Sequence, residues 1–180
     1  MGLPHLSKAQ DYNSPVQYLH SNLERKRFLI SVYHLYQSVR DYEDSVMIAS
    51  GWKSEPHLTS IDSLYEVDSI LIRKIDQYLD HYKYPDRKGF EEVPRITPWL
   101  VLNHSRNAQI RQKHFPVLYQ AYQEGNLEER RLLKFLEDEY ERQFERNFQS
   151  YAVEEARVGE LMQVLELMPA RGRKLFRSQR

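Results

Sequence analysis

The sequence predicts an all-α protein, and three observations lead to this conclusion. Through most of the 180 residues, apolar side chains recur at the three- and four-residue spacing of amphipathic helices. No stretch shows the strict apolar–polar alternation that marks a half-buried strand. The periodic stretches are separated by loop-like segments that read GWKSEPH (51–57) and KYPDRKGFEEVP (83–94). We therefore expect a single-domain bundle of four to five helices.

The first two helices are predicted from their start signals and apolar stripes. Ser14 followed by Pro15 is a typical helix start, and the pattern then runs to about Ser50. The apolar stripe changes direction at residues 25–27, so we expect a break there. The second helix is expected to begin at Thr59 or Ser60 and to end near Tyr82.

The second half of the chain predicts three more helical stretches. Thr97-Pro98 opens a helix that continues, bent or broken at Pro116, until Gly125 ends it. A fourth long helix is expected from Leu127 to about Gln149. A last amphipathic stretch, Val153–Met168, ends before Pro169.

These elements divide the chain into four segments. We expect a flexible N-terminal tail (1–13), a helical domain (14–152), an amphipathic C-terminal helix (153–170) and a basic tail (171–180). The apolar side of the C-terminal helix is expected to pack on the bundle, with docking on a partner or dimerisation as the alternative. The oligomeric state stays open.

Composition and charge exclude several classes of protein. Lys plus Arg and Asp plus Glu both number 26, so the net charge of zero does not favour a nucleic-acid partner. There is no cysteine, which excludes disulfides and thiolate metal sites. No apolar run is long enough for a membrane span, and the first residues lack the apolar region of a signal peptide. We expect a soluble, cytoplasmic protein without a cofactor, with an exported mature form as the alternative.

Polar residues inside the apolar arcs of the helices mark the candidate site, because burying a charge is costly unless it is paired. They are spread over four predicted helices, which we expect to face one centre. The set is Arg40 and Glu43, Asp68, His104, and Glu139 with Gln143. The helix around His104 is apolar on nearly every side, so its imidazole is expected to point into the protein.

An ordered set of short motifs also resembles a known family. Gln37 and Arg40 match an early glutamine–arginine pair, Asp68 a helical aspartate, and Tyr84-Pro85 an aromatic–proline turn. Trp99 lies five residues before His104, Leu136 and Asp138 follow, and Gln149 and Tyr151 match a closing motif. Over about residues 30–152 the chain resembles a family of small bacterial proteins that is common in the Bacteroidota and classed as a domain of unknown function. Tyr36, Glu139 and Ala152 depart from that pattern.

The resemblance implies no reaction, but it adds Trp99, Gln149 and Tyr151 to the candidate ligand-binding residues. It also selects Arg40, Asp68 and His104, which the helical arcs select independently. His104 and Asp68 are therefore our candidate catalytic residues. Arg40, Glu43, Trp99, Glu139, Gln143, Gln149 and Tyr151 are the candidate ligand-binding residues.

Three kinds of chemistry fit this set. A hydrolase-like or transferase-like pocket would use an Asp68–His104 pair to activate water, with Arg40 holding a small anionic ligand. A metal site would use Glu43, Asp68, His104 and Glu139, but the usual Glu-x-x-His motif is absent, so we expect no metal. In the third case the protein is a non-catalytic interaction module, and the polar cluster only sets helix register. The first is preferred, and whether the protein is an enzyme stays open.

Overall fold

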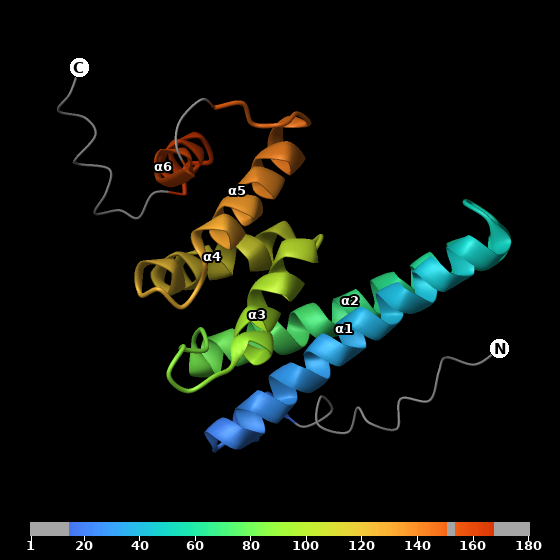
Figure 1. Ribbon diagram of the computed structural model, residues 1–180, viewed down its shortest axis with the longest axis horizontal. Coiled ribbons are helices and arrows are strands. Elements are labelled where there is room, and N and C mark those ends of the chain that lie inside the picture. The colour runs from blue at the N-terminus through green and yellow to red at the C-terminus, as the bar shows by residue number, and fades with distance from the viewer. Residues whose placement is uncertain (1–14, 151–153, 168–180) are drawn as a thin grey trace. The chain divides into compact units, whose positions relative to one another are not determined.

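The computed structural model describes residues 15–150 and 154–167, and this part contains six α-helices and no strand (Figure 1). The all-α prediction is thereby confirmed. The described residues separate into two compact units, divided between Arg111 and Gln112, where the sequence predicted one bundle of four or five helices. None of the described helices is long and apolar enough to cross a bilayer. The predicted tails, 1–13 and 171–180, lie outside the described residues.

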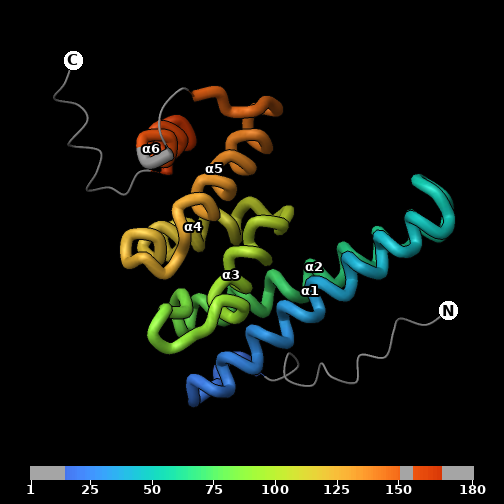
Figure 2. Tube along the Cα trace, viewed as in Figure 1, coloured from blue at the N-terminus to red at the C-terminus, as the bar shows by residue number. Residues whose placement is uncertain are grey.

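The first unit is built on a helical hairpin. α1 (Asn22–Ser50) and α2 (Glu55–Tyr82) lie side by side, and α3 (Glu92–His104) packs against both (Figure 1). A short 3-10 turn, η2 (Val16–Tyr18), precedes α1 and packs on α2. Figure 2 shows the two hairpin helices continuing past α3 to their connecting turn. The core of this unit includes Phe28, Leu29, Val32, Leu71, Ile75, Tyr78 and Leu102.

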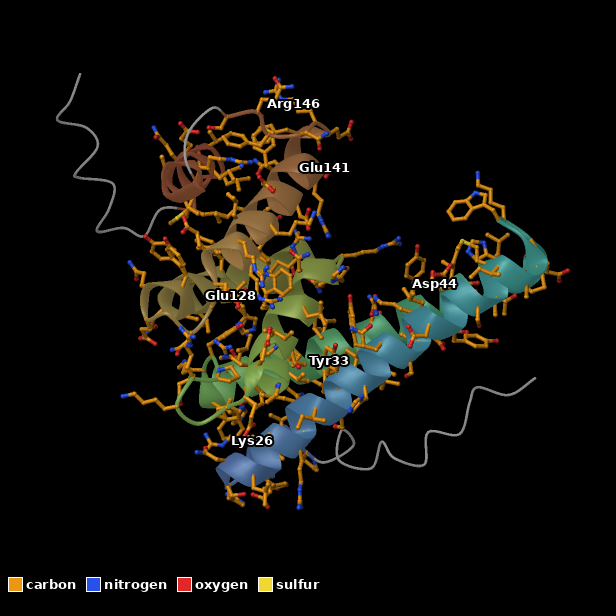
Figure 3. The ribbon with its side chains drawn as sticks, viewed as in Figure 1. Lys26, Tyr33, Asp44, Glu128, Glu141 and Arg146 are labelled. Carbon is orange, nitrogen blue, oxygen red and sulfur yellow. The ribbon has the colours of Figure 1, made fainter. Side chains whose placement is uncertain are left out.

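The start of α1 is set by a capping box. The Ser21 hydroxyl accepts a hydrogen bond from the Glu24 amide at 3.1 Å, and the Glu24 carboxylate accepts one from the Ser21 amide at 2.7 Å. The predicted start at Pro15 opens only the 3-10 turn. Lys26, labelled in Figure 3, then pairs with Glu91 at 2.7 Å and joins the start of α1 to the N-cap residue of α3.

Two other helices begin earlier than the sequence predicted. Ser54 caps α2 through the amide of His57, so α2 starts at Glu55, with a proline in its first turn. α3 starts at Glu92, and Pro98 lies inside it rather than at its start. The apolar pattern locates both helices, but the local cap decides where each one begins.

α4 (Ala108–Gln123) crosses the boundary between the units, and the second unit continues with α5 (Glu129–Phe144) and α6 (Glu154–Val164). Phe115 stacks on Phe135, with ring centroids 6.4 Å apart, which joins α4 to α5. α6 packs on α5, and its Leu161 and Leu165 are buried. Burial of Leu161 and Leu165 fits the expectation that the last helix packs within its own chain, although Val164 on the same side is exposed.

The capping box predicts a defined loss of stability. Ser21→Ala leaves the Glu24 amide without its acceptor, so we expect the free energy of unfolding to fall by about 1 kcal/mol. Ser45→Ala near the end of α1 is the matched control, since its exposed hydroxyl bonds only the Tyr42 carbonyl. Urea unfolding followed by circular dichroism measures both, and equal losses would contradict the role of the cap.

Candidate functional site

A groove in the first unit contains two of the predicted site residues, Asp68 and His104. One side is a face of α2, and the other is the junction between α3 and α4. The volume of the groove is about 640 Å³. Its lining residues are Tyr65, Asp68, Ser69, Ile72 and Arg73 from α2, and His104, Ser105, Arg106, Asn107 and Ile110 from the junction. The α2 residues are spaced three and four apart, which places them on one helical face.

Asp68 is held by Arg40 rather than by His104. Nη2 of Arg40 donates to both carboxylate oxygens of Asp68, at 3.0 and 2.9 Å, and both side chains are half-buried. Nη1 of Arg40 donates to the Tyr36 carbonyl at 3.2 Å. The pair therefore links α1 to α2, and the guanidinium predicted to hold a ligand is already occupied by a carboxylate of the chain itself.

Tyr36 connects this ion pair to the imidazole. The Arg40 guanidinium lies over the Tyr36 ring, 3.5 Å from its centroid, and the Tyr36 hydroxyl lies 2.9 Å from Nδ1 of His104. Burial raises the pKa of Tyr36 to about 12, because the charged phenolate is poorly solvated there. Tyr36 therefore stays protonated at neutral pH and keeps its hydroxyl available for hydrogen bonding.

His104 is exposed, and the expectation that its imidazole points into the protein was wrong. The reason is that His104 is the last residue of α3, where the chain leaves the helix. The side chain of its neighbour Asn103 is buried instead. Nδ1 of His104 lies 3.0 Å from the Leu100 carbonyl, which can only accept a hydrogen bond. That contact favours the tautomer with the proton on Nδ1, and Nε2 is then the basic nitrogen.

The α3–α4 junction is held by its own hydrogen bonds. The Ser105 hydroxyl accepts from the Asn107 amide at 3.0 Å, and Asn107 caps α4 by accepting from the Ile110 amide at 3.1 Å. Arg111, which is fully buried, donates from Nη1 to the Ser105 carbonyl at 3.0 Å. These bonds fix the backbone that carries His104 and Arg106.

Two arginines of the groove lack a carboxylate partner among the described residues. Arg106 donates to the Tyr65 hydroxyl, and its guanidinium lies 3.8 Å from the centroid of the Tyr65 ring. Arg73 donates from Nε to the Ser69 carbonyl at 3.2 Å. Because Arg40 neutralises Asp68, the charge of the groove is dominated by these two guanidinium groups. The groove therefore suits an anion better than a divalent cation.

Glu43 belongs to a different cluster. Its carboxylate lies 2.7 Å from Nε2 of His57, and Nδ1 of His57 accepts from the Lys53 amide at 3.0 Å. His57 is fully buried, close to the turn between α1 and α2. Glu43 is thus engaged by a histidine and is not among the residues that line the groove.

The remaining predicted residues do not line the groove. Trp99 is buried, and Glu139 (buried) and Gln143 (exposed) lie on α5 in the second unit. Gln149 is exposed, and Tyr151 lies outside the described residues. Sequence reasoning also missed Arg73 and Arg106. The usable signal for Arg73 was its place five residues after Asp68, one turn beyond Ser69 on the same side of α2.

No family model matches the chain, and no curated protein or solved structure is significantly similar to it. Membership of the Bacteroidota family therefore stays a prediction from the motifs quoted above. The functional argument rests on the geometry of the groove.

Removal of the Asp68 charge is expected to destabilise the first unit. Asp68→Asn leaves the half-buried Arg40 guanidinium without its counter-charge, which should cost about 1–3 kcal/mol of unfolding free energy. Asp62→Asn, on the same helix and exposed, is the control and should stay within about 0.5 kcal/mol of the wild type. Urea unfolding distinguishes the two variants. If Asp68→Asn is as stable as the wild type, the ion pair does not stabilise the fold.

The raised pKa of Tyr36 predicts a loss of stability at alkaline pH. A tyrosine in the unfolded chain loses its proton near pH 10, whereas Tyr36 in the folded chain keeps it until about pH 12. Between these values the unfolded state binds fewer protons, so the unfolding free energy falls as pH rises. Tyr36→Phe should make this decline shallower. Urea unfolding at a series of pH values from 9 to 12 tests it, and parallel declines in both proteins would contradict the assignment.

Proposed function

We propose that the groove between α2 and the α3–α4 junction binds a small anionic molecule, with Arg73 and Arg106 contacting its negative group. The supporting observation is the pair of guanidinium groups that line the groove and that no carboxylate of the described residues neutralises. Arginine presents planar N–H donors that match phosphate and carboxylate oxygens. Arg40 keeps a supporting role, since it neutralises Asp68.

The local backbone favours the same ligand charge. α4 begins at the groove, and the N-terminal end of a helix carries a partial positive charge. The stacking of Arg106 on Tyr65 restrains the guanidinium before a ligand arrives. A restrained donor loses less conformational entropy on binding, which increases affinity.

We further propose that any reaction in the groove is a hydrolysis in which Nε2 of His104 accepts a proton from water. The two groove serines fit a nucleophilic role poorly. The Ser69 hydroxyl donates to the Tyr65 carbonyl at 2.8 Å, and the Ser105 hydroxyl accepts from the Asn107 amide. Neither bonds His104, so a water molecule is the better nucleophile. The predicted Asp68–His104 pair is replaced here by a Tyr36–His104 contact.

The alternative is an interaction module in which the polar cluster is structural. The observation that favours it is the mutual satisfaction of Arg40, Asp68 and Tyr36, which bond one another and need no ligand. This alternative explains the ion pair but leaves Arg73 and Arg106 without a role. Anion binding separates the two proposals.

Phosphate binding tests the groove directly. We expect inorganic phosphate to shift the amide resonances of Ser105, Arg106 and Asn107 in a titration followed by nuclear magnetic resonance. Arg73→Ala and Arg106→Ala should each weaken phosphate binding about tenfold, as loss of a charge-assisted hydrogen bond implies. Arg27→Ala, an exposed arginine of α1 outside the groove, is the control and should bind as the wild type does.

The anion site would be contradicted if all three variants bound phosphate as tightly as the wild type. It would also be contradicted if phosphate did not shift the amide resonances of the junction residues. A hydrolytic role makes one further demand. His104→Ala should then keep phosphate binding while losing turnover of aryl phosphate esters. If turnover is unchanged in that variant, His104 takes no part in the reaction, and the groove is only a binding site.

A further inference from the structure

The turn between α1 and α2 carries a second surface, which does not share residues with the groove. We define the hairpin tip as residues 41–62, which comprise the end of α1, the turn, and the start of α2, and which include no residue that lines the groove. Figure 2 shows this turn at the end of the hairpin beyond α3. Its side chains are mostly exposed or half-buried, with His57 and Ser60 as the buried exceptions.

Large apolar side chains are exposed at this tip. Ile48 is 80% exposed, Trp52 69% and Leu58 51%, within one stretch of eleven residues. Single exposed apolar residues are ordinary on a protein surface, but several together mark an interaction surface. Tryptophan is also one of the side chains that contribute most of the binding energy in protein interfaces.

The turn is fixed by hydrogen bonds rather than loosely connected. The Ser50 and Ser54 hydroxyls lie 2.7 Å apart, and Ser54 caps α2. The buried His57 accepts from the Lys53 amide and lies against Glu43, and the Trp52 ring lies 5.1 Å from the His57 ring. Trp52 thus rests with one part on a buried histidine and presents the rest to solvent.

The charge of the tip is strongly acidic. Between residues 41 and 62 there are five acidic residues and one basic residue, Lys53. All of the acids except Glu43 are exposed, including Asp44, which Figure 3 labels on α1. A chain with zero net charge therefore has a concentrated negative region around its exposed apolar side chains. Nucleic acid and anionic lipid would be repelled by this surface.

We propose that the hairpin tip is a docking surface for a basic peptide segment that carries large apolar side chains. The apolar side chains of the partner would pack on Ile48, Trp52 and Leu58, which are rigidly presented. Its lysines and arginines would pair with the surrounding carboxylates, which gives complementary charge and orientation. This surface is separate from the groove, and its test does not depend on anion binding there.

A synthetic peptide tests the proposal on the full chain. The probe has the sequence ARGRKLFRSQR, that of residues 170–180, which combines five basic residues with Leu and Phe. Fluorescence anisotropy of the labelled peptide should show binding that weakens as salt is added. The same peptide with every Arg and Lys replaced by Glu should not bind.

Two variants of the tip have matched controls elsewhere. Trp52→Ser should weaken peptide binding by more than about tenfold, and Leu23→Ser, another exposed apolar residue, should have little effect. Asp44→Lys should weaken binding about fivefold through charge reversal, whereas Glu141→Lys on α5 should not. Asp44 is exposed, and its side chain makes no hydrogen bond or ion pair among the described residues, so this variant tests charge without disturbing the turn.

Several results would overturn the proposal. The proposal is wrong if the peptide does not bind. It is also wrong if the tip variants and their controls change peptide binding equally. Binding of phosphatidylcholine vesicles that is lost in Trp52→Ser would assign the tip to a lipid surface instead. Self-association in sedimentation that disappears in the same variant would assign it to a second copy of the chain.

Discussion

The ion pair between Arg40 and Asp68 determines much of the first unit. It joins the two longest helices at half-buried positions, where a single unpaired charge would be costly. The same guanidinium lies on the Tyr36 ring, and the Tyr36 hydroxyl contacts His104. The pair also removes the one negative charge among the lining residues of the groove. The register of α1 against α2, the position of the His104 imidazole and the charge of the groove therefore all depend on the Arg40–Asp68 contact.

The hairpin carries two surfaces of opposite character. Its tip is acidic and partly apolar, whereas further along α2 the groove presents Arg73 and, from the junction, Arg106. Each surface has a buried or half-buried polar pair beneath it, the contact of His57 with Glu43 at the tip and the ion pair of Arg40 with Asp68 at the groove. Rigid helices separate these regions, so the two charges do not cancel locally. A chain of zero net charge can thus carry regions of opposite charge at different places.

Apolar periodicity predicted the helices, and the cost of buried charge correctly marked Arg40, Glu43 and Asp68 as inward residues. The partners of these residues were not predictable, because a helical arc gives direction but not the neighbour that it faces. For the same reason the sequence did not indicate two units. His104 was misplaced because the helix ends there, and helix ends depend on caps. Arg106 joins the groove through the fold of the junction, which has no periodic signature.

The helical hairpin has a consequence for how this protein can vary in length. Insertion of seven residues in each helix between the ion pair and the tip would add about two turns, or about 10 Å, and nearly restore the angular position of every side chain. Such a change would move the tip outward while Arg40 still faced Asp68. A single-residue insertion would instead rotate the tip by about 100° relative to the groove. Changes of hairpin length that keep both surfaces in place are therefore expected to add a near-whole number of helical turns to each helix.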